Sequence, residues 1–352
     1  MSHTLVVRPD NAGDVLLAGP ALRAVAAGSH RVSVLAGPAG RAAAELLPGV
    51  DEVLEWRCPW IDPAPRPVDP ADVASLVEAL RGRRFDRALV LTSFHQSPLP
   101  TALVLRLAGV AWVGAISEDY PGSLLDLRHR CDDLLPEPER ALSLALAAGF
   151  DLPEGDHGAL AVRRPLPDVS GLVPDSPYLV LHPGTSVPAR AWPADRFAAT
   201  AQLLAVQGHS VVVTGAPSER PLTAQVADDA EALDLGGRTD LAQLAAVLDR
   251  AQVVVVGNTG PAHLAAAVGT PVVSLFAPTV PAQRWAPYHV PSVLLGDQDA
   301  VCRDTRVTTC PFPGHPCLSS VAPQDAVGAV DELLSGSPRT SRPPVGAVRR
   351  TP

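Results

Sequence analysis

The chain has 352 residues, of which 47% are hydrophobic, and this length suits two globular domains of about 150 residues better than one core. Its net charge of −9 and the lack of a basic stripe argue against a nucleic-acid partner. All 28 basic residues are arginine, so mechanisms that need a P-loop lysine or a Schiff-base lysine are excluded.

Short apolar runs alternate along the chain with alanine- and leucine-rich segments of helical period, a pattern typical of β-α repeats around parallel sheets. In the first half we expect strands at residues 4–9, 31–37, 51–56, 87–93 and 111–117 and helices at residues 15–27, 40–47, 72–82 and 100–109. A second alternation predicts strands at residues 178–184, 209–215, 232–237, 251–257 and 271–276 and helices at residues 196–208, 218–230, 240–250 and 261–269.

The two halves are joined by residues 153–177, which are rich in proline, glycine and aspartate, as expected of an interdomain connection. The prediction is therefore an α/β protein with two Rossmann-like, doubly wound domains at residues 1–168 and 169–334. Residues 335–352 have no apolar period and are expected to form a disordered tail.

The N-terminal residues show no signal peptide, and no run approaches the roughly 18 apolar residues that would span a bilayer. Five scattered cysteines do not make a disulfide framework. We therefore expect a cytoplasmic protein without a transmembrane segment, with transient contact at the inner face of the membrane left open.

Polar, glycine-containing loops recur where a predicted strand leads into a helix. None of them fits the G-x-G-x-x-G pattern of a nicotinamide site, so a dehydrogenase is disfavoured. Free amides and the helix dipole at such positions favour anions. Three loops of the second half, at residues 181–197, 213–220 and 256–267, should line one crevice at the carboxyl ends of the strands.

Four segments, at residues 8–24, 182–198, 211–220 and 253–288, resemble the ADP-heptose:lipopolysaccharide heptosyltransferases, glycosyltransferase family 9, in order and spacing. With the β-α alternation, the resemblance covers roughly residues 4 to 334. It implies the GT-B fold, with two facing Rossmann-like domains. The first domain would take the acceptor and the second the nucleotide-sugar donor.

The resemblance assigns the general base to Asp14, which would remove the proton of the attacking acceptor hydroxyl. Asp10 is a weaker candidate for that base. An aspartate at this place is also an ordinary helix cap, and this alternative stays open. Asn11 and Gly13 would shape the loop, the glycine allowing close approach of a ligand.

The family's donor-binding positions fall on three loops of the second half. Thr185, Ser186 and Arg190 would bind the diphosphate, with Arg190 standing where the family usually has lysine, and Gly184 would permit the turn. Capping hydroxyls and a surface arginine are the alternatives. Further candidates are Glu219 for the ribose, and Thr259, Gly260 and His263 for the phosphates. A first-turn glutamate and a packed histidine are the plainer interpretations.

Asn258 departs from the family, which mostly has aspartate at this position to bind the donor sugar. Asparagine keeps an acceptor and gains a donor while losing the charge, so the sugar contact would survive with a changed preference. Asn258 and Asn11 are the two asparagines of the chain. The resemblance places them on the same cleft from opposite domains, although asparagine is also common in turns.

The implied reaction is an inverting transfer of a heptose-like sugar from an ADP-sugar to an acceptor hydroxyl. No cofactor and no metal bound by a D-x-D motif is expected. Two alternatives are a GT-B nucleotide-sugar epimerase and a catalytically silent nucleotide-sugar-binding protein. The acceptor, a glycan, a lipid-linked molecule or a small molecule, would be read by first-domain loops, where Trp60 and His95 are weak candidates.

Cys302, Cys310 and Cys317 share a loop-rich segment with His315, which makes a zinc site conceivable. The spacings lack a C-x-x-C knuckle. We therefore favour free thiols, or at most a redox-sensitive pair.

Overall fold

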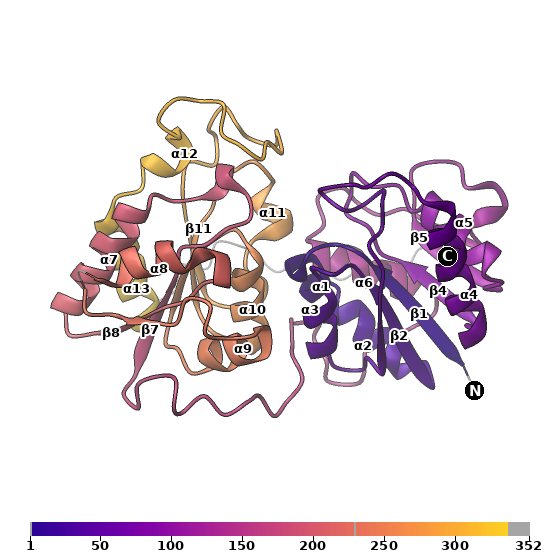
Figure 1. Cartoon of the computed structure of the whole chain (residues 1–352), viewed down its shortest axis with the longest axis horizontal. Coiled ribbons are helices and arrows are strands. Elements are labelled where there is room, and N and C mark those ends of the chain that lie inside the picture. The colour runs from indigo at the N-terminus through magenta and orange to yellow at the C-terminus, as the bar shows by residue number, and fades with distance from the viewer. Residues whose placement is uncertain (1, 229, 337–352) are drawn as a thin grey trace.

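The computed structural model describes residues 2–228 and 230–336, which form two lobes lying side by side (Figure 1). Each lobe contains a six-stranded sheet, and every strand pairing in both sheets is parallel. The strands of the first sheet end at His129, and those of the second begin at Tyr178. The predicted α/β fold with two doubly wound domains is confirmed.

The first lobe contains the strands β1 (His3–Arg8), β2 (Arg31–Ala36), β3 (Glu52–Glu55), β4 (Arg87–Val90), β5 (Trp112–Ile116) and β6 (Leu127–His129). Its helices are α1 (Ala12–Leu17), α2 (Gly19–Ala27), α3 (Arg41–Leu46), α4 (Pro70–Arg83), α5 (Leu99–Leu107) and α6 (Glu137–Ala147), with the short 3₁₀ helix η1 (Gly122–Leu124).

The second lobe contains the strands β7 (Tyr178–His182), β8 (Ser210–Val213), β9 (Leu233–Asp234), β10 (Val254–Gly257), β11 (Val272–Leu275) and β12 (Ser292–Leu295). Its helices are α7 (Ala194–Val206), α8 (Arg220–Asp228), α9 (Leu241–Asp249), α10 (Gly260–Val268), α11 (Ala282–Trp285), α12 (Pro316–Ser319) and α13 (Pro323–Leu334), with the 3₁₀ helices η2 (Pro188–Arg190) and η3 (Pro217–Glu219).

The two sheets share one topology. The first has the order β3-β2-β1-β4-β5-β6, and the second, read from β9, has the matching order β9-β8-β7-β10-β11-β12. The chain changes direction across each sheet between β1 and β4 and between β7 and β10. Ligands of doubly wound sheets bind outside the carboxyl ends of the strands at such a switch point. This topology therefore places the loops after β1, β4, β7 and β10 around the ligand position.

Several elements differ from the prediction. The helix expected at residues 15–27 divides at Ala18 into α1 and α2, because Pro20 lacks an N–H and its ring crowds the carbonyl of Leu16. The edge strands β6 and β12 were missed: their residues are only half-buried, β6 has no apolar run, and that of β12 is only three residues long. The amphipathic helices α6 and α13 were also missed. Most of the predicted disordered tail, residues 337–352, lies outside the described residues.

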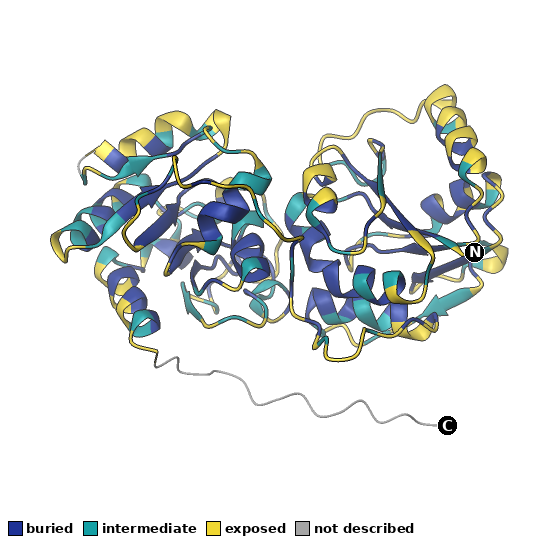
Figure 2. Cartoon of the chain, turned by 90° about the horizontal axis from the view of Figure 1, so that it is seen from below, coloured by how far each residue is buried: buried dark blue, intermediate teal, exposed yellow. Residues whose placement is uncertain are grey.

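Aliphatic side chains form the interior of both lobes, and buried residues fill the strands and the inner faces of the helices (Figure 2). The lobes also contact each other, because α1 packs against α10 and α3 against α9. One apolar cluster continues across this contact and includes Leu16 of α1 and Leu264 of α10. Within the described residues, no helix is long and apolar enough to cross a membrane.

A substitution at Leu22 tests how much the stability of the first lobe depends on its buried aliphatic side chains. Its side chain on α2 is completely buried, so Leu22→Ala should lower the free energy of unfolding by about 2–5 kcal/mol. Leu107→Ala is the matched control, because Leu107 is 54% exposed on α5 and its loss should cost less than about 0.5 kcal/mol. Urea denaturation of both variants checks the difference, and equal destabilisation would contradict it.

Candidate active site

A cavity of about 540 Å³ lies between the lobes at the carboxyl ends of the strands. Loops after β1, β2, β3 and β4 form its first wall, and loops after β7, β10 and β11 form much of the opposite one. Most of the predicted site residues line it together: Asn11, Gly13, Asp14, Ser186, Arg190, Asn258, Thr259, Gly260 and His263. Gly184, Thr185 and Glu219 are not among the residues that line this cavity.

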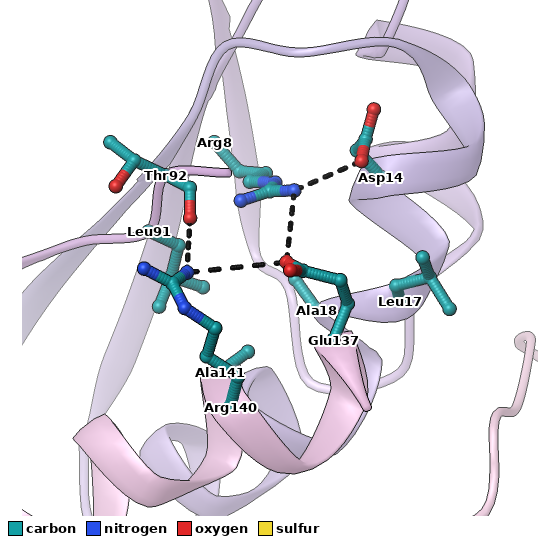
Figure 3. A pocket seen from close by; sticks show the side chains of 9 residues that line it. All are labelled: Arg8, Asp14, Leu17, Ala18, Leu91, Thr92, Glu137, Arg140 and Ala141. Atoms are coloured by element: carbon teal, nitrogen blue, oxygen red, sulfur yellow. Dashed lines mark hydrogen bonds and ion pairs between the residues drawn. The ribbon is translucent and has the colours of Figure 1, made fainter. Parts of the chain in front are cut away.

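Asp14 lies in the first turn of α1, and its side chain is 23% exposed. Asn11 occupies the N-cap position, without a side-chain capping bond. The carboxylate of Asp14 instead accepts a hydrogen bond from Arg8, with Nη2 3.1 Å from Oδ1 (Figure 3). Asp14 is therefore held by a buried cation and still borders the cavity, which a general base requires.

Arg8 is the centre of a buried group of charges. Its guanidinium lies 3.2 Å from Asp10 (Nε to Oδ2) and 3.9 Å from Glu137 (Nη2 to Oε2), and Arg140 lies on the far side of Glu137 (Figure 3). Burial by itself would lower the pKa of Arg8, but Asp10, Asp14 and Glu137 outweigh burial and raise it. Arg8 therefore stays cationic and fixes the position of Asp14.

The beginnings of α1 and α10 meet across the cleft. A Cβ atom added to Gly13 would lie 3.1 Å from Cδ2 of His263 and 3.2 Å from the Cα atom of Gly260. The glycine thus allows close approach of the second lobe, in addition to any ligand that enters beside it. Thr259 is the N-cap residue of α10, and its own N–H donates to the carbonyl oxygen of Gly257 at 2.8 Å. Gly260 is the first residue of the helix and lines the cavity, so the beginning of α10 offers the Gly260 N–H there.

His263 is a neutral side chain on the wall of the cavity. It is 6% exposed, and burial, aided by the nearby charge of Arg190, lowers its pKa to about 4. Its Nδ1 atom is buried and has no hydrogen-bond partner among the described residues. The imidazole therefore lines the cavity without adding charge to it.

Arg190 approaches the cavity from η2. Its Nη1 atom lies 3.4 Å from the carbonyl oxygen of Asn258, and its Nε atom is buried with no partner in the described part of the chain. Burial lowers the pKa of the guanidinium, and the carboxylate of Asp14 in the opposite lobe counteracts that shift. Arg190 thus faces Asp14 across the cleft. The guanidinium can bind an anion on one side, and the carboxylate can bind a hydroxyl on the other.

The side chain of Asn258 is buried and occupied by backbone groups. Its Nδ2 atom donates to the carbonyl oxygen of Ala277 at 3.1 Å, and its Oδ1 atom accepts from the Ala277 N–H at 3.2 Å. Both polar ends therefore tie the loop after β10 to the segment after β11. This geometry favours a loop-positioning role for the side chain over the sugar contact that the sequence predicts.

Gly184, Thr185 and Glu219 form a local group beside the cavity. The carboxylate of Glu219 accepts from the N–H of Ala216 at 2.7 Å, and a Cβ atom on Gly184 would come within 2.1 Å of Oε2 of Glu219. The glycine thus allows the carboxylate to lie against the loop after β7. Thr185 accepts from the Val187 N–H at 3.2 Å, which shapes the same loop.

Arg8, Glu137 and Arg306 were not identified from the sequence as site residues. Arg8 ends an otherwise apolar strand, and because arginine is almost never buried unless it is paired, this position was a usable signal. Glu137 begins a helix that was missed, and Arg306 lies on the irregular loop between β12 and α12. Their places depend on long-range packing that the residue pattern does not encode.

The cysteine-bearing segment contains free thiols. Burial and the neighbouring Cys302 raise the pKa of Cys317 to about 12, so this thiol is not ionised near neutral pH. His315 points elsewhere, with its Nε2 atom 3.0 Å from the carbonyl oxygen of Ala189. Across residues 2–228 and 230–336, no group of three or more histidine, cysteine, aspartate or glutamate residues has a metal-binding arrangement.

Two facing doubly wound lobes with a cavity at the carboxyl ends of both sheets are the GT-B arrangement. The family model "Glycosyltransferase family 9 (heptosyltransferase)" matches residues 73–315. The chain therefore belongs to glycosyltransferase family 9, as the sequence motifs predicted.

Sequence relatives and solved structures agree with this membership. Lipopolysaccharide heptosyltransferase 1 of Pseudomonas aeruginosa is 35% identical over 171 residues, which are 48% of this chain and 46% of that protein. The chain spans about half the length of the curated relatives it matches.

Two solved structures show the same fold over nearly the whole chain. The glycosyl transferase family 9 protein of Veillonella parvula DSM 2008 has a TM-score of 0.79 at 18% identity, covering 96% of this chain and 98% of that one. The E. coli heptosyltransferase WaaC with ADP-2-deoxy-2-fluoro heptose has a TM-score of 0.71 at 20% identity, covering 94% and 99%.

The two hydrogen bonds of Asn258 can be tested by Asn258→Asp. The carboxylate keeps the bond from the Ala277 N–H but faces the carbonyl oxygen of Ala277 without a proton to donate, so we expect a loss of about 1–3 kcal/mol in the free energy of unfolding. Asn11→Asp adds the same charge at an exposed position and should be close to neutral. If urea denaturation shows that both variants are equally stable, the contact with Ala277 does not position the loop.

The low pKa of His263 predicts a pH dependence of stability. Between pH 4 and 6.5 the unfolded chain binds a proton that the folded imidazole does not, so the free energy of unfolding should fall as the pH falls through this window, by up to about 1.4 kcal/mol per pH unit for this residue. His263→Gln should reduce the slope, and His30→Gln, at an exposed position, should not. Urea denaturation at several pH values measures it, and an unchanged slope in His263→Gln would contradict the assignment.

Proposed function

We propose that the protein is an inverting glycosyltransferase that moves a heptose-like sugar from an ADP-sugar donor to an acceptor hydroxyl. The observation that carries this proposal is the placement of Asp14 and Arg190 on opposite lobes of one cavity. Family membership supports the reaction class, and the relative WaaC was crystallised with ADP-2-deoxy-2-fluoro heptose. The donor is therefore assigned to the second lobe and the acceptor to the first.

The chemistry follows from which groups lie on each wall. Asp14 takes the proton of the acceptor hydroxyl as its oxygen forms a bond to the anomeric carbon. The bond from that carbon to the diphosphate oxygen breaks, and its electron pair leaves with ADP. Because the base and the diphosphate anchors lie on opposite walls, the attack comes from the face opposite the leaving group, and the configuration inverts.

Positive charge for the leaving diphosphate comes from the second lobe. Arg190 supplies a guanidinium that can bind two phosphate oxygens, and the beginning of α10 supplies the N–H of Gly260 and the hydroxyl of Thr259. These donors are in place before the reaction and stabilise the charge that develops on the diphosphate. We therefore propose that the transfer needs no additional cofactor.

The acceptor class follows from the relatives by analogy. Several of them are named lipopolysaccharide or lipooligosaccharide heptosyltransferases, so a glycan carried on a lipid is one acceptor that we propose, alongside soluble glycans and small molecules. The enzyme would then work in the cytoplasm, with transient contact to the inner face of the membrane when its acceptor is lipid-linked.

Asp14→Asn is the direct test of the mechanism. The amide keeps the size of the side chain but does not take up a proton, so turnover of ADP-heptose should fall by a factor of about 10²–10⁴. Binding of ADP, measured by calorimetry, should not weaken, because the diphosphate anchors lie on the other lobe. ADP release with an acceptor panel measures turnover.

Asp175→Asn is the matched control, because Asp175 is exposed in the segment before β7. It should retain full turnover. Full turnover in Asp14→Asn would remove Asp14 from the mechanism. A wild-type protein that binds ADP but releases no product with any acceptor would instead favour a silent nucleotide-sugar binder.

A further inference from the structure

Arg306 brings a second arginine to the cavity from the cysteine-bearing segment at residues 302–317, outside the four segments that carry the family resemblance. Its N–H donates to the carbonyl oxygen of Thr279 at 2.8 Å, and its backbone has a φ of 57°. The residue lines the same cavity as Asp14 and Arg190. A β-branched residue would be strained in this left-handed conformation, so the loop is shaped to present this side chain at a specific place.

The side chain of Arg306 contacts the opposite lobe. Its Nη2 atom lies 2.9 Å from Nε2 of His95, and its guanidinium lies 5.0 Å from the ring centre of Phe94. Arg284 of the second lobe lies over the same ring at 4.1 Å. Phe94 of the first lobe therefore contacts two guanidinium groups of the second.

These contacts bring no carboxylate next to Arg306: burial lowers its pKa, and Asp14 counteracts that shift only from a distance. Burial, and next the charge of Arg306 itself, lower the pKa of His95 to about 4, so near neutral pH this imidazole accepts a hydrogen bond and carries no charge. Among the described residues, no carboxylate lies within 4.0 Å of the guanidinium of Arg306 or of Arg190. Arg57, on the first wall, differs because it pairs with Asp62 at 2.5 Å.

Two like charges that face one cavity, beside the amides of α10, create a site for an anion with more than one charge. Each guanidinium repels the other, and a bound diphosphate would relieve that repulsion by contacting both. A group with a single charge would leave one of them unneutralised. The arrangement thus matches a diphosphate better than a carboxylate.

We infer that Arg306 is a second cation for the donor diphosphate, and that its contacts with Phe94 and His95 couple donor binding to the closed arrangement of the lobes. This inference rests on the proposed function, since it takes the donor to be a nucleoside diphosphate sugar. The donor site is then built from both lobes: Arg190 and α10 bind the diphosphate from the second, and the first positions Arg306 through Phe94.

Calorimetry with ADP and with adenosine tests the inference on the intact protein. Arg306→Gln should weaken ADP binding about 10- to 100-fold, as expected for loss of a hydrogen bond to a charged group, and should leave adenosine binding unchanged. Arg303→Gln removes the same charge from the same loop, but Arg303 is 61% exposed and pairs with Asp299 at 2.8 Å. This control should bind ADP like the wild type.

Two further variants separate the effect of the charge at residue 306 from the effect of its position and from a folding defect. Arg306→Lys should recover part of the ADP affinity, which a folding defect would not allow. Phe94→Leu keeps the charge but removes the ring on which Arg306 lies, and should weaken ADP binding less than Arg306→Gln does. Unchanged affinity in Phe94→Leu would overturn the coupling between the lobes.

The outcomes distinguish this inference from the proposed function. Wild-type affinity for ADP in Arg306→Gln would overturn the role of Arg306 while leaving the donor assignment intact. An equal loss of ADP and adenosine binding would show that Arg306 acts on the nucleoside or on the fold, and would also overturn it. A wild-type protein that binds no ADP would reject the donor assignment itself.

Discussion

The site depends on the contact between the beginnings of two helices, α1 of the first lobe and α10 of the second. Gly13 and Gly260 meet there with almost no side-chain volume between them, and the apolar cluster behind them continues from one lobe into the other. Because both helices start at the carboxyl ends of their sheets, this contact brings the two ligand-binding edges together. Any larger residue at Gly13 would have to displace His263 or move the lobes apart.

The charges are divided between the two sides of that contact. The first lobe buries Asp10 and Glu137 around Arg8, and this group supports Asp14 at the edge of the cavity. The second lobe presents Arg190, and no ion pair joins it to a carboxylate of that lobe within residues 169–228 and 230–336. A hydroxyl that must lose a proton needs a carboxylate beside it, and a phosphate that gains negative charge needs a cation. The first lobe supplies the carboxylate and the second supplies the cation. The lobes can therefore perform different tasks although their topologies match.

Much of this organisation could be predicted from the sequence. The alternating pattern was sufficient for five of the six strands in each sheet, and loops that follow buried strands had to gather at one edge, which explains why Asp14, Arg190 and His263 line a common cavity. Partners far apart in the chain could not be predicted. Asn258 was predicted to contact the donor sugar. Its hydrogen bonds to Ala277 depend on where β11 ends, which the residue pattern does not reveal. Arg306 was not predicted because its loop has no periodicity.

The absence of lysine has a consequence for this site. Burial lowers the pKa of Arg190, and it would do the same to a lysine at this position. A lysine starts nearer to neutral and loses its charge readily when it is buried, whereas a guanidinium remains charged and presents a planar pair of donors. The chain can thus keep its cation in a cleft that the opposite lobe closes. Arg190 stands where the family usually has lysine. Compared with a lysine, it keeps its positive charge when it is buried, and its planar guanidinium suits two phosphate oxygens.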